Sequence, residues 1–278
     1  MTWWHALILG VVQGLTEFFP VSSSGHLALV PWLFGWDHFQ SDSVASSFDA
    51  ALHLGTLVAV VGAVRVELAG LIVAGVRHPF ASRAERAVSP HGRLAWLFVL
   101  TALPAAAVGA VFDDVITDAL GGPVTVACSL VVFGLVLWIA DRREGSRQPL
   151  DLTVPDALMI GASQVLSLNP GTSRSGITIS MMRFLGYERA AAVRMSFVMG
   201  VPIIAGAGVF KVVALVADGI PDGLLLPMVI GVATAAATGW LAINALQRLA
   251  ARSNFNVFVI YRVVLGLAVL NLAATGLR

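Results

Sequence analysis

The chain has 278 residues, of which 58% are hydrophobic and 12% are charged, and its formal net charge is +1. A soluble domain carries about 25% charged residues, so this composition excludes a cytosolic enzyme and a disordered chain. The small net charge also excludes a nucleic-acid-binding protein built on a basic face. Apolar stretches close to the ~20 residues that cross a bilayer recur along the sequence, so we predict an all-α polytopic membrane protein.

The predicted elements, in chain order, are ten apolar segments. They are 3–19, 27–35, 48–76, 94–112, 124–140, 154–168, 177–185, 195–217, 224–246 and 255–274. Five of them are each able to cross a bilayer. Segment 48–76 is interrupted by Arg65 and Glu67, so we expect one span to about Val64 and a short interfacial helix after it.

Four of the ten segments are too short or too broken to span: 3–19, 27–35, 154–168 and 177–185. They form two pairs, and a turn rich in Pro, Gly and Ser joins the members of each pair. Such pairs predict re-entrant hairpins, which a bilayer tolerates only where the broken backbone lines a cavity. The prediction is therefore six spans and two hairpins.

The loops differ in charge. Loops 77–93, 141–153, 186–194 and 247–254 carry eleven of the seventeen Lys and Arg residues. Loops 36–47, 113–122 and 218–222 carry none of them but hold Asp37, Asp42, Asp113, Asp114, Asp118, Asp218 and Asp222. The positive-inside rule places the first set in the cytoplasm and the second outside. The hairpin at 3–35 then enters the membrane from outside, and the hairpin at 154–185 enters from the cytoplasm. Both chain ends lie outside.

The two hairpin turns share a pattern. Residues 13–25 read QGLTEFFPVSSSG and residues 164–176 read QVLSLNPGTSRSG. Each half therefore predicts a hairpin plus three spans, and the odd number of crossings inverts the second copy. We expect a single membrane domain of two inverted repeats, about 1–141 and 154–278. Inverted repeats place broken-helix sites at the membrane midplane, so the two turns should meet there.

Polar side chains at membrane depth are costly, and by default they indicate function. The candidates are Gln13, Glu17, Ser22, Ser23 and His26 in the first turn, and Gly171, Ser173, Arg174, Ser175, Gly176 and Thr178 in the second. Helix starts with nearby glycines suit an anion, and Arg174 adds a fork that matches phosphate oxygens. Glu17 is able to hold a divalent cation such as Mg²⁺. His26 is a candidate base or nucleophile and Ser23 an alternative nucleophile, so we predict a hydrolase for a lipid phosphate or diphosphate.

These residues also have structural interpretations. Serine and glycine clusters allow close helix packing, and Glu17 with Arg174 is able to form a buried ion pair. Asp49 and His53, four residues apart at the start of a span, are weaker candidates: they are able to act as partners of the site residues, but packing or interface roles are expected. A secondary transporter or lipid flippase is the alternative function, because inverted repeats with broken helices are a transporter layout. An acid and a histidine near the phosphate favour catalysis.

At these residues the sequence resembles the undecaprenyl-diphosphatase family, bacterial membrane phosphatases linked to bacitracin resistance. Residues 13–27, QGLTEFFPVSSSGHL, and residues 169–180, NPGTSRSGITIS, are similar to its two signatures, with further matches at 48–60 and 196–202. The resemblance covers essentially the whole chain. It implies removal of the terminal phosphate of undecaprenyl diphosphate, an isoprenyl diphosphate lipid, which regenerates the carrier for peptidoglycan synthesis. It also implies dependence on a divalent cation, Mg²⁺ or alternatively Ca²⁺.

The resemblance further implies roles for individual residues. Glu17 and Gln13 fall on the metal-and-water motif, and Ser23 and His26 fall on the nucleophile or base positions. Ser173, Arg174 and Thr178 fall on the diphosphate-binding loop. Gln13 stands where some members have glutamate, so this chain has one carboxylate in the motif rather than two. The implied location is the bacterial inner membrane with a site open to the periplasmic side; the choice of nucleophile, and whether the chain forms a homodimer, stay open.

Overall fold

The fold is known from a computed structural model that describes residues 1–36, 42–82, 84–85, 89–218 and 223–277. Within those ranges the regular structure is helical, with one isolated bridge between Arg147 and Tyr187. The prediction of an all-α protein is therefore confirmed. Of the acidic loop residues used to orient the chain, six lie outside the part whose side chains are described: Asp37, Asp42, Asp113, Asp114, Asp218 and Asp222.

Six helices in the described part of the chain are long and apolar enough to cross a bilayer. They are α3 (Asp42–Arg77), α5 (His91–Leu120), α6 (Pro123–Asp141), α9 (Arg189–Asp218), α10 (Leu225–Arg252) and α11 (Asn256–Ala274). Large apolar side chains such as Val58, Val132 and Val264 are exposed along them. Exposed apolar faces on long helices suit contact with lipid, and the prediction of six spans is confirmed by length and composition.

Two pairs of shorter helices complete the fold. The first hairpin is α1 (Trp3–Phe18) with α2 (Ser23–Phe34). The second is α7 (Val154–Val165), the short 3-10 helix η3 (Leu166–Leu168) and α8 (Arg174–Phe184). The predicted division of these regions into helical hairpins is thus confirmed. Their approach from opposite sides of the membrane, and the inverted relation of the two halves, stay predictions.

The long helix α3 has a kink where its apolar sequence is interrupted by charged residues. Val64 has non-helical torsion angles (φ −106°, ψ 15°) inside an otherwise continuous helix. The charged residues follow at once: Arg65 donates a hydrogen bond to the Gly62 carbonyl, and Glu67 pairs with Arg194 of α9 at 2.5 Å. The predicted break at Val64 is therefore confirmed.

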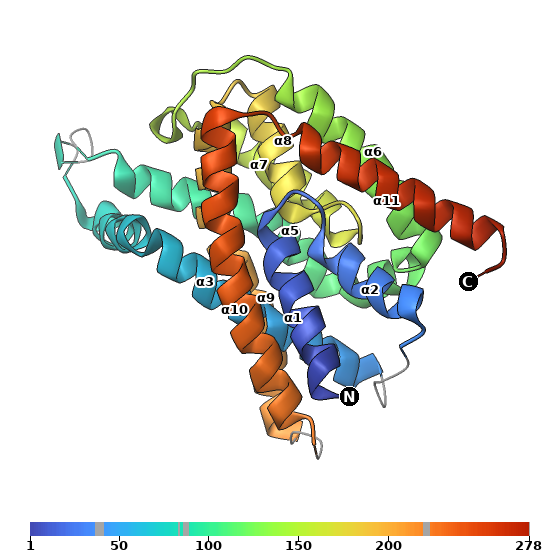
Figure 1. Cartoon of the computed structure of the whole chain (residues 1–278). Helices are drawn as coiled ribbons and strands as arrows, with labels where there is room; N and C mark the ends of the chain where they lie inside the picture. Colours follow the sequence, from blue (N-terminus) through green and yellow to red (C-terminus); the bar gives the residue numbers. More distant parts are fainter. Residues whose placement is uncertain (37–41, 83, 86–88, 219–222, 278) are drawn as a thin grey trace.

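Both hairpins pack against the spanning helices. In Figure 1, α1 lies along α10 and α11 lies along α6, in agreement with their contacts. A Cβ atom at Gly14 of α1 would lie 2.0 Å from Thr238 Oγ1 of α10, so glycine is needed for this close approach. In the second hairpin α7 packs on α5, and α8 packs on α6 and α9. The spanning helices thereby hold the two hairpin turns in the interior.

Candidate active site

The two hairpin turns share an unusual backbone. Ser22 caps α2 with φ 76°, and Ser173 caps α8 with the same φ. No other non-glycine residue in the described ranges has a positive φ, and such strain persists where surrounding structure enforces it, often at functional sites. Ser22 Oγ accepts a hydrogen bond from the Gly25 N–H at 3.3 Å, and Ser173 Oγ accepts one from Gly176 at 3.1 Å. The serine of each turn therefore orders the start of the helix that follows.

The two turns are in direct contact, as the sequence predicts. The Gly171 N–H of the second turn donates to Ser22 Oγ of the first at 3.1 Å. In the same direction, from the second hairpin to the first, Ser175 Oγ donates to the Phe19 carbonyl at 3.1 Å. The first turns of α2 and α8 are thereby brought to one place.

Glu17, on the last turn of α1, is a third link between the two hairpins and is 7% exposed. Its Oε2 accepts hydrogen bonds from Ser23 Oγ at 2.7 Å and from Gln13 Nε2 at 3.2 Å. Its Oε1 accepts one from Arg174 Nη2 at 3.0 Å. A buried carboxylate needs such partners, and this one joins the first residue of α2 to the first residue of α8.

Arg174 also contacts α9, through the other terminal nitrogen of its guanidinium. Its Nη1 donates to the Ser196 carbonyl at 3.3 Å. A Cβ atom at Gly200, one turn further along α9, would lie only 2.3 Å from the same Nη1. The guanidinium therefore occupies space that glycine leaves free, and its fork is fixed beside the serine hydroxyl.

His26 lies one turn after Ser23 and is 5% exposed. Its Nδ1 is 2.6 Å from the Ser22 carbonyl oxygen, and its Nε2 is 2.6 Å from the hydroxyl of Tyr261 on α11. The ring also stacks on that of Tyr261, with planes 10° apart. Both ring nitrogens thus have partners other than the Glu17 carboxylate.

Of the other predicted substrate-binding residues, three have hydroxyls occupied within the hairpins. Thr178 Oγ1 donates to the Arg174 carbonyl at 2.7 Å, and the hydroxyls of Ser173 and Ser175 are 3.1 Å apart. Ser23 and Arg174 are the two helix-start residues that reach the carboxylate. An incoming phosphate at this point would meet a hydroxyl and a guanidinium.

Comparison with known proteins identifies the family. Residues 6–268 match the family model described as bacitracin resistance protein BacA. The chain belongs to the BacA family. Proteins named undecaprenyl-diphosphatase are among its relatives: one from Desulforudis audaxviator is 44% identical, with 97% of each chain covered. Others from Geobacter metallireducens and Geobacter sulfurreducens are 41% and 42% identical, with 96% of each chain covered.

Two further residues that contact the hairpin turns gave little or no signal in the sequence. His53 of α3, predicted to serve packing, lies with Nε2 3.6 Å from Glu17 Oε2, while its Nδ1 is 2.8 Å from the Asp49 carbonyl oxygen. The geometry therefore agrees with the alternative role of His53 as a partner of a site residue, because its ring faces the Glu17 carboxylate. The sequence signals for His53 were its i, i+4 spacing from Asp49 and its place in the family-like stretch 48–60.

Arg262 of α11 was missed, although it is completely buried. Its guanidinium donates to the carbonyls of Pro20 at 2.9 Å and Gly171 at 2.8 Å, which joins the turns of both hairpins. A lone arginine within the apolar segment 255–274 is the signal that would have found it, because intramembrane charges are rarely without a role.

The donor set around Glu17 suits an ion that arrives with a phosphate. The described residues contain no group of three or more His, Cys, Asp or Glu side chains able to hold a metal. Gln13 Oε1, however, is buried without a hydrogen-bond partner, next to the Glu17 carboxylate that Gln13 Nε2 contacts. Mg²⁺ is usually bound by one or two carboxylates together with substrate phosphates, so Glu17 fits this mode, and the unpartnered Gln13 Oε1 is an additional oxygen donor.

A second carboxylate cluster lies at the start of α7, outside the six spanning helices. Asp156 accepts hydrogen bonds from Arg147 at 2.5 Å, Thr153 Oγ1 at 2.7 Å and Tyr187 at 3.1 Å. Burial acts to raise the pKa of Asp156, but these bonds, led by the one from Arg147, outweigh it and lower the pKa to about 2. This cluster anchors the second hairpin to the loops before and after it.

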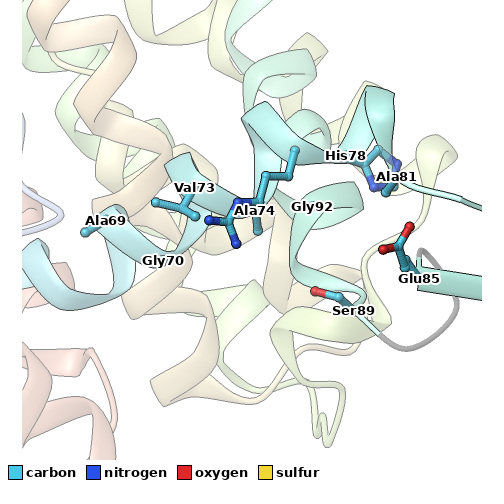
Figure 2. A pocket seen from close by; sticks show the side chains of 10 residues that line it. Ala69, Gly70, Val73, Ala74, His78, Ala81, Glu85, Ser89 and Gly92 are labelled. Atoms are coloured by element: carbon cyan, nitrogen blue, oxygen red, sulfur yellow. The ribbon is translucent and has the colours of Figure 1, made fainter.

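A cavity of about 560 Å³ lies between the end of α3 and the start of α5 (Figure 2). Gly70, Arg77, His78, Glu85 and Gly92 are among the residues that line it. None of the predicted site residues contributes to its wall. The predicted site residues therefore gather at the hairpin turns, apart from this cavity.

Proposed function

We propose that the chain is a membrane phosphatase that hydrolyses undecaprenyl diphosphate to undecaprenyl phosphate and inorganic phosphate. The observation that carries the proposal is the 2.7 Å hydrogen bond from Ser23 Oγ to Glu17, whose other oxygen meets Arg174. A hydroxyl within reach of a base that a third group orients is typical of an activated nucleophile. The name of the relatives supplies the substrate class.

In the first step Ser23 Oγ attacks the terminal phosphorus. Its proton passes to Glu17 Oε2, and the bond from phosphorus to the bridging oxygen breaks, which releases undecaprenyl phosphate. Arg174 donates to the oxygens of the transferred phosphoryl group, where its fixed guanidinium stabilises the negative charge. The product of this step is a phosphoryl group on Ser23.

In the second step water attacks the phosphorus on Ser23. The water gives one proton towards His26, whose ring lies one helical turn after the phosphorylated serine. The bond from phosphorus to Ser23 Oγ breaks, inorganic phosphate leaves, and Ser23 regains its proton from Glu17. The imidazolium of His26 gives the proton it gained to the departing phosphate, and each group then has the protonation state with which it began.

A divalent cation, Mg²⁺ or alternatively Ca²⁺, completes the proposal. Glu17 and Gln13 Oε1 would hold it, and the ion would neutralise part of the charge on the diphosphate. We place the enzyme in the bacterial inner membrane with its site open to the periplasmic side, where it recycles the lipid carrier of peptidoglycan synthesis. The sequence leaves open whether the chain forms a homodimer, and the mass of the protein in detergent answers that question.

The test is phosphate release from undecaprenyl diphosphate by the purified protein in detergent, with Mg²⁺ and with EDTA. We expect Ser23→Ala to lower kcat by about 1,000-fold or more, because it removes the nucleophile. Ser24→Ala is the matched control, since this neighbouring hydroxyl contacts Ser22 rather than Glu17, and it should keep wild-type turnover.

Two results would contradict the proposal. Equal activity of Ser23→Ala and Ser24→Ala would remove Ser23 from the chemistry. A folded wild-type protein that releases no phosphate, even with other cations and shorter prenyl chains, would favour a transporter or flippase of isoprenyl phosphates instead.

A further inference from the structure

One face of α11 meets the turn of the first hairpin. Phe258, Tyr261 and Arg262 follow the i, i+3, i+4 spacing that places side chains on one side of a helix. The ring of Phe258 lies 5.0 Å from that of Phe19, and Arg262 donates to the Pro20 carbonyl. Tyr261, between these two contacts, meets His26. The tyrosine hydroxyl is therefore held in place by contacts on both sides of it.

The contacts of His26 determine which nitrogen carries its proton. A carbonyl oxygen only accepts hydrogen bonds, so the contact to the Ser22 carbonyl requires a hydrogen on Nδ1. In the neutral ring Nε2 is then the acceptor, and the Tyr261 hydroxyl 2.6 Å away donates to it. The single lone pair that would make His26 a base is thus directed at the phenol.

The exposure of the two residues differs. The imidazole of His26 is 5% exposed, whereas Tyr261 is 45% exposed. A proton that reaches Nε2 without displacing the tyrosine has to pass through its hydroxyl. A phenol is able to donate one proton while it accepts another.

We propose that Tyr261 is a proton relay between His26 and the attacking water, an inference that rests on the proposed phosphatase. As the water oxygen bonds to phosphorus, the water gives a proton to the Tyr261 oxygen and the phenol gives its own proton to His26 Nε2. The bond from phosphorus to Ser23 Oγ breaks, and Ser23 takes back the proton from Glu17. The phenol is unchanged at the end, and the imidazolium Nε2–H then donates to it.

The relay predicts that Tyr261 serves the second chemical step alone. Tyr261→Phe keeps the ring and removes the hydroxyl, so we expect kcat to fall about 100-fold with KM unchanged and with phosphorylated Ser23 accumulating. Ile260→Val, on the exposed face of the same helix, is the control and should behave as wild type. The single variant His26→Gln and the double variant His26→Gln/Tyr261→Phe should show the same kcat. The second change adds no further loss, because both residues lie on one proton path.

A spectroscopic measurement separates this inference from the phosphatase itself. In protein labelled with ¹⁵N-histidine, the His26 ring signals, assigned with His26→Gln, should show a hydrogen on Nδ1 and a hydrogen-bonded Nε2 that changes in Tyr261→Phe. A hydrogen on Nε2 alone in the neutral ring, or unchanged kcat in Tyr261→Phe with an active wild type, would overturn the relay and leave the phosphatase standing. A folded wild-type protein that releases no phosphate would overturn both.

Discussion

The turns of the two hairpins share a backbone conformation but carry different side chains. Both turns place a serine at φ 76° before the second helix, and in both its hydroxyl accepts from the glycine N–H three residues later. The first residue of that helix is Ser23 in one hairpin and Arg174 in the other. Both donate to the same Glu17 carboxylate, so equivalent positions supply a hydroxyl and a cation to one site.

The difference shows how the chemistry is divided. In the register that aligns Ser22 with Ser173, Glu17 corresponds to Leu168, so only the first hairpin carries the acid. The second hairpin contributes the guanidinium that an anionic substrate needs. Neither hairpin alone contains the proposed nucleophile, base and cation, and the proposed site is complete only where the two turns meet.

The largest effect on activity is expected from loss of the carboxylate that both hairpins contact. Glu17→Gln keeps the shape of the side chain but removes the base and the charge, so we expect a fall in kcat/KM of about 1,000-fold and loss of stimulation by Mg²⁺. Phosphate release with and without the cation measures both effects. Glu144→Gln, on an exposed loop residue, is the control; a Glu17→Gln protein with an unchanged response to Mg²⁺ would exclude Glu17 as a ligand.

A smaller effect is expected from crowding the cation of the second hairpin. Gly200→Ala puts a methyl group where Arg174 Nη1 lies, so the guanidinium has to shift away from Glu17 and the phosphate. We expect KM to rise about tenfold, as for the loss of one charge-assisted hydrogen bond. In Gly206→Ala on the same helix the added Cβ meets nothing within 4 Å; equal effects of the two changes would show that Arg174 is not positioned by α9.

The smallest effect on activity is expected at the anchor of the second hairpin. The folded-state pKa of Asp156, about 2, lies below its ordinary value of 3.8. This group therefore stabilises the fold above about pH 4, by about 2 kcal/mol, and the contribution is lost as the pH falls towards 2.

Asp156→Asn should lower the free energy of unfolding at pH 7 by about that amount and flatten its dependence on pH between 4 and 2. Turnover at pH 7 should stay close to that of the wild type. Unfolding in detergent followed by circular dichroism makes the measurement, with Asp118→Asn, at an exposed site, as the control. An unaltered pH profile would mean that Asp156 does not anchor the hairpin through its charge.

Hydropathy and charge were sufficient to predict the helices, because a bilayer imposes the length and apolar character of each span. The same physics identified Glu17, Ser23 and Arg174 as polar groups at depth. The same reasoning did not predict a role for Tyr261 or Arg262. Tyr261 contacts a histidine 235 positions away, and the partners of Arg262 are backbone carbonyls that any sequence supplies.

The most direct test of the account asks where the phosphoryl group goes. Excess protein, wild type and His26→Gln, is mixed with undecaprenyl diphosphate and quenched within one turnover, and its peptides are analysed by mass spectrometry. We predict a phosphoryl group on Ser23, present briefly in the wild type and accumulating in His26→Gln. A phosphoryl group on His26 of the wild type, or a slowed His26→Gln protein without any modified Ser23, would contradict the division of labour between the hairpins.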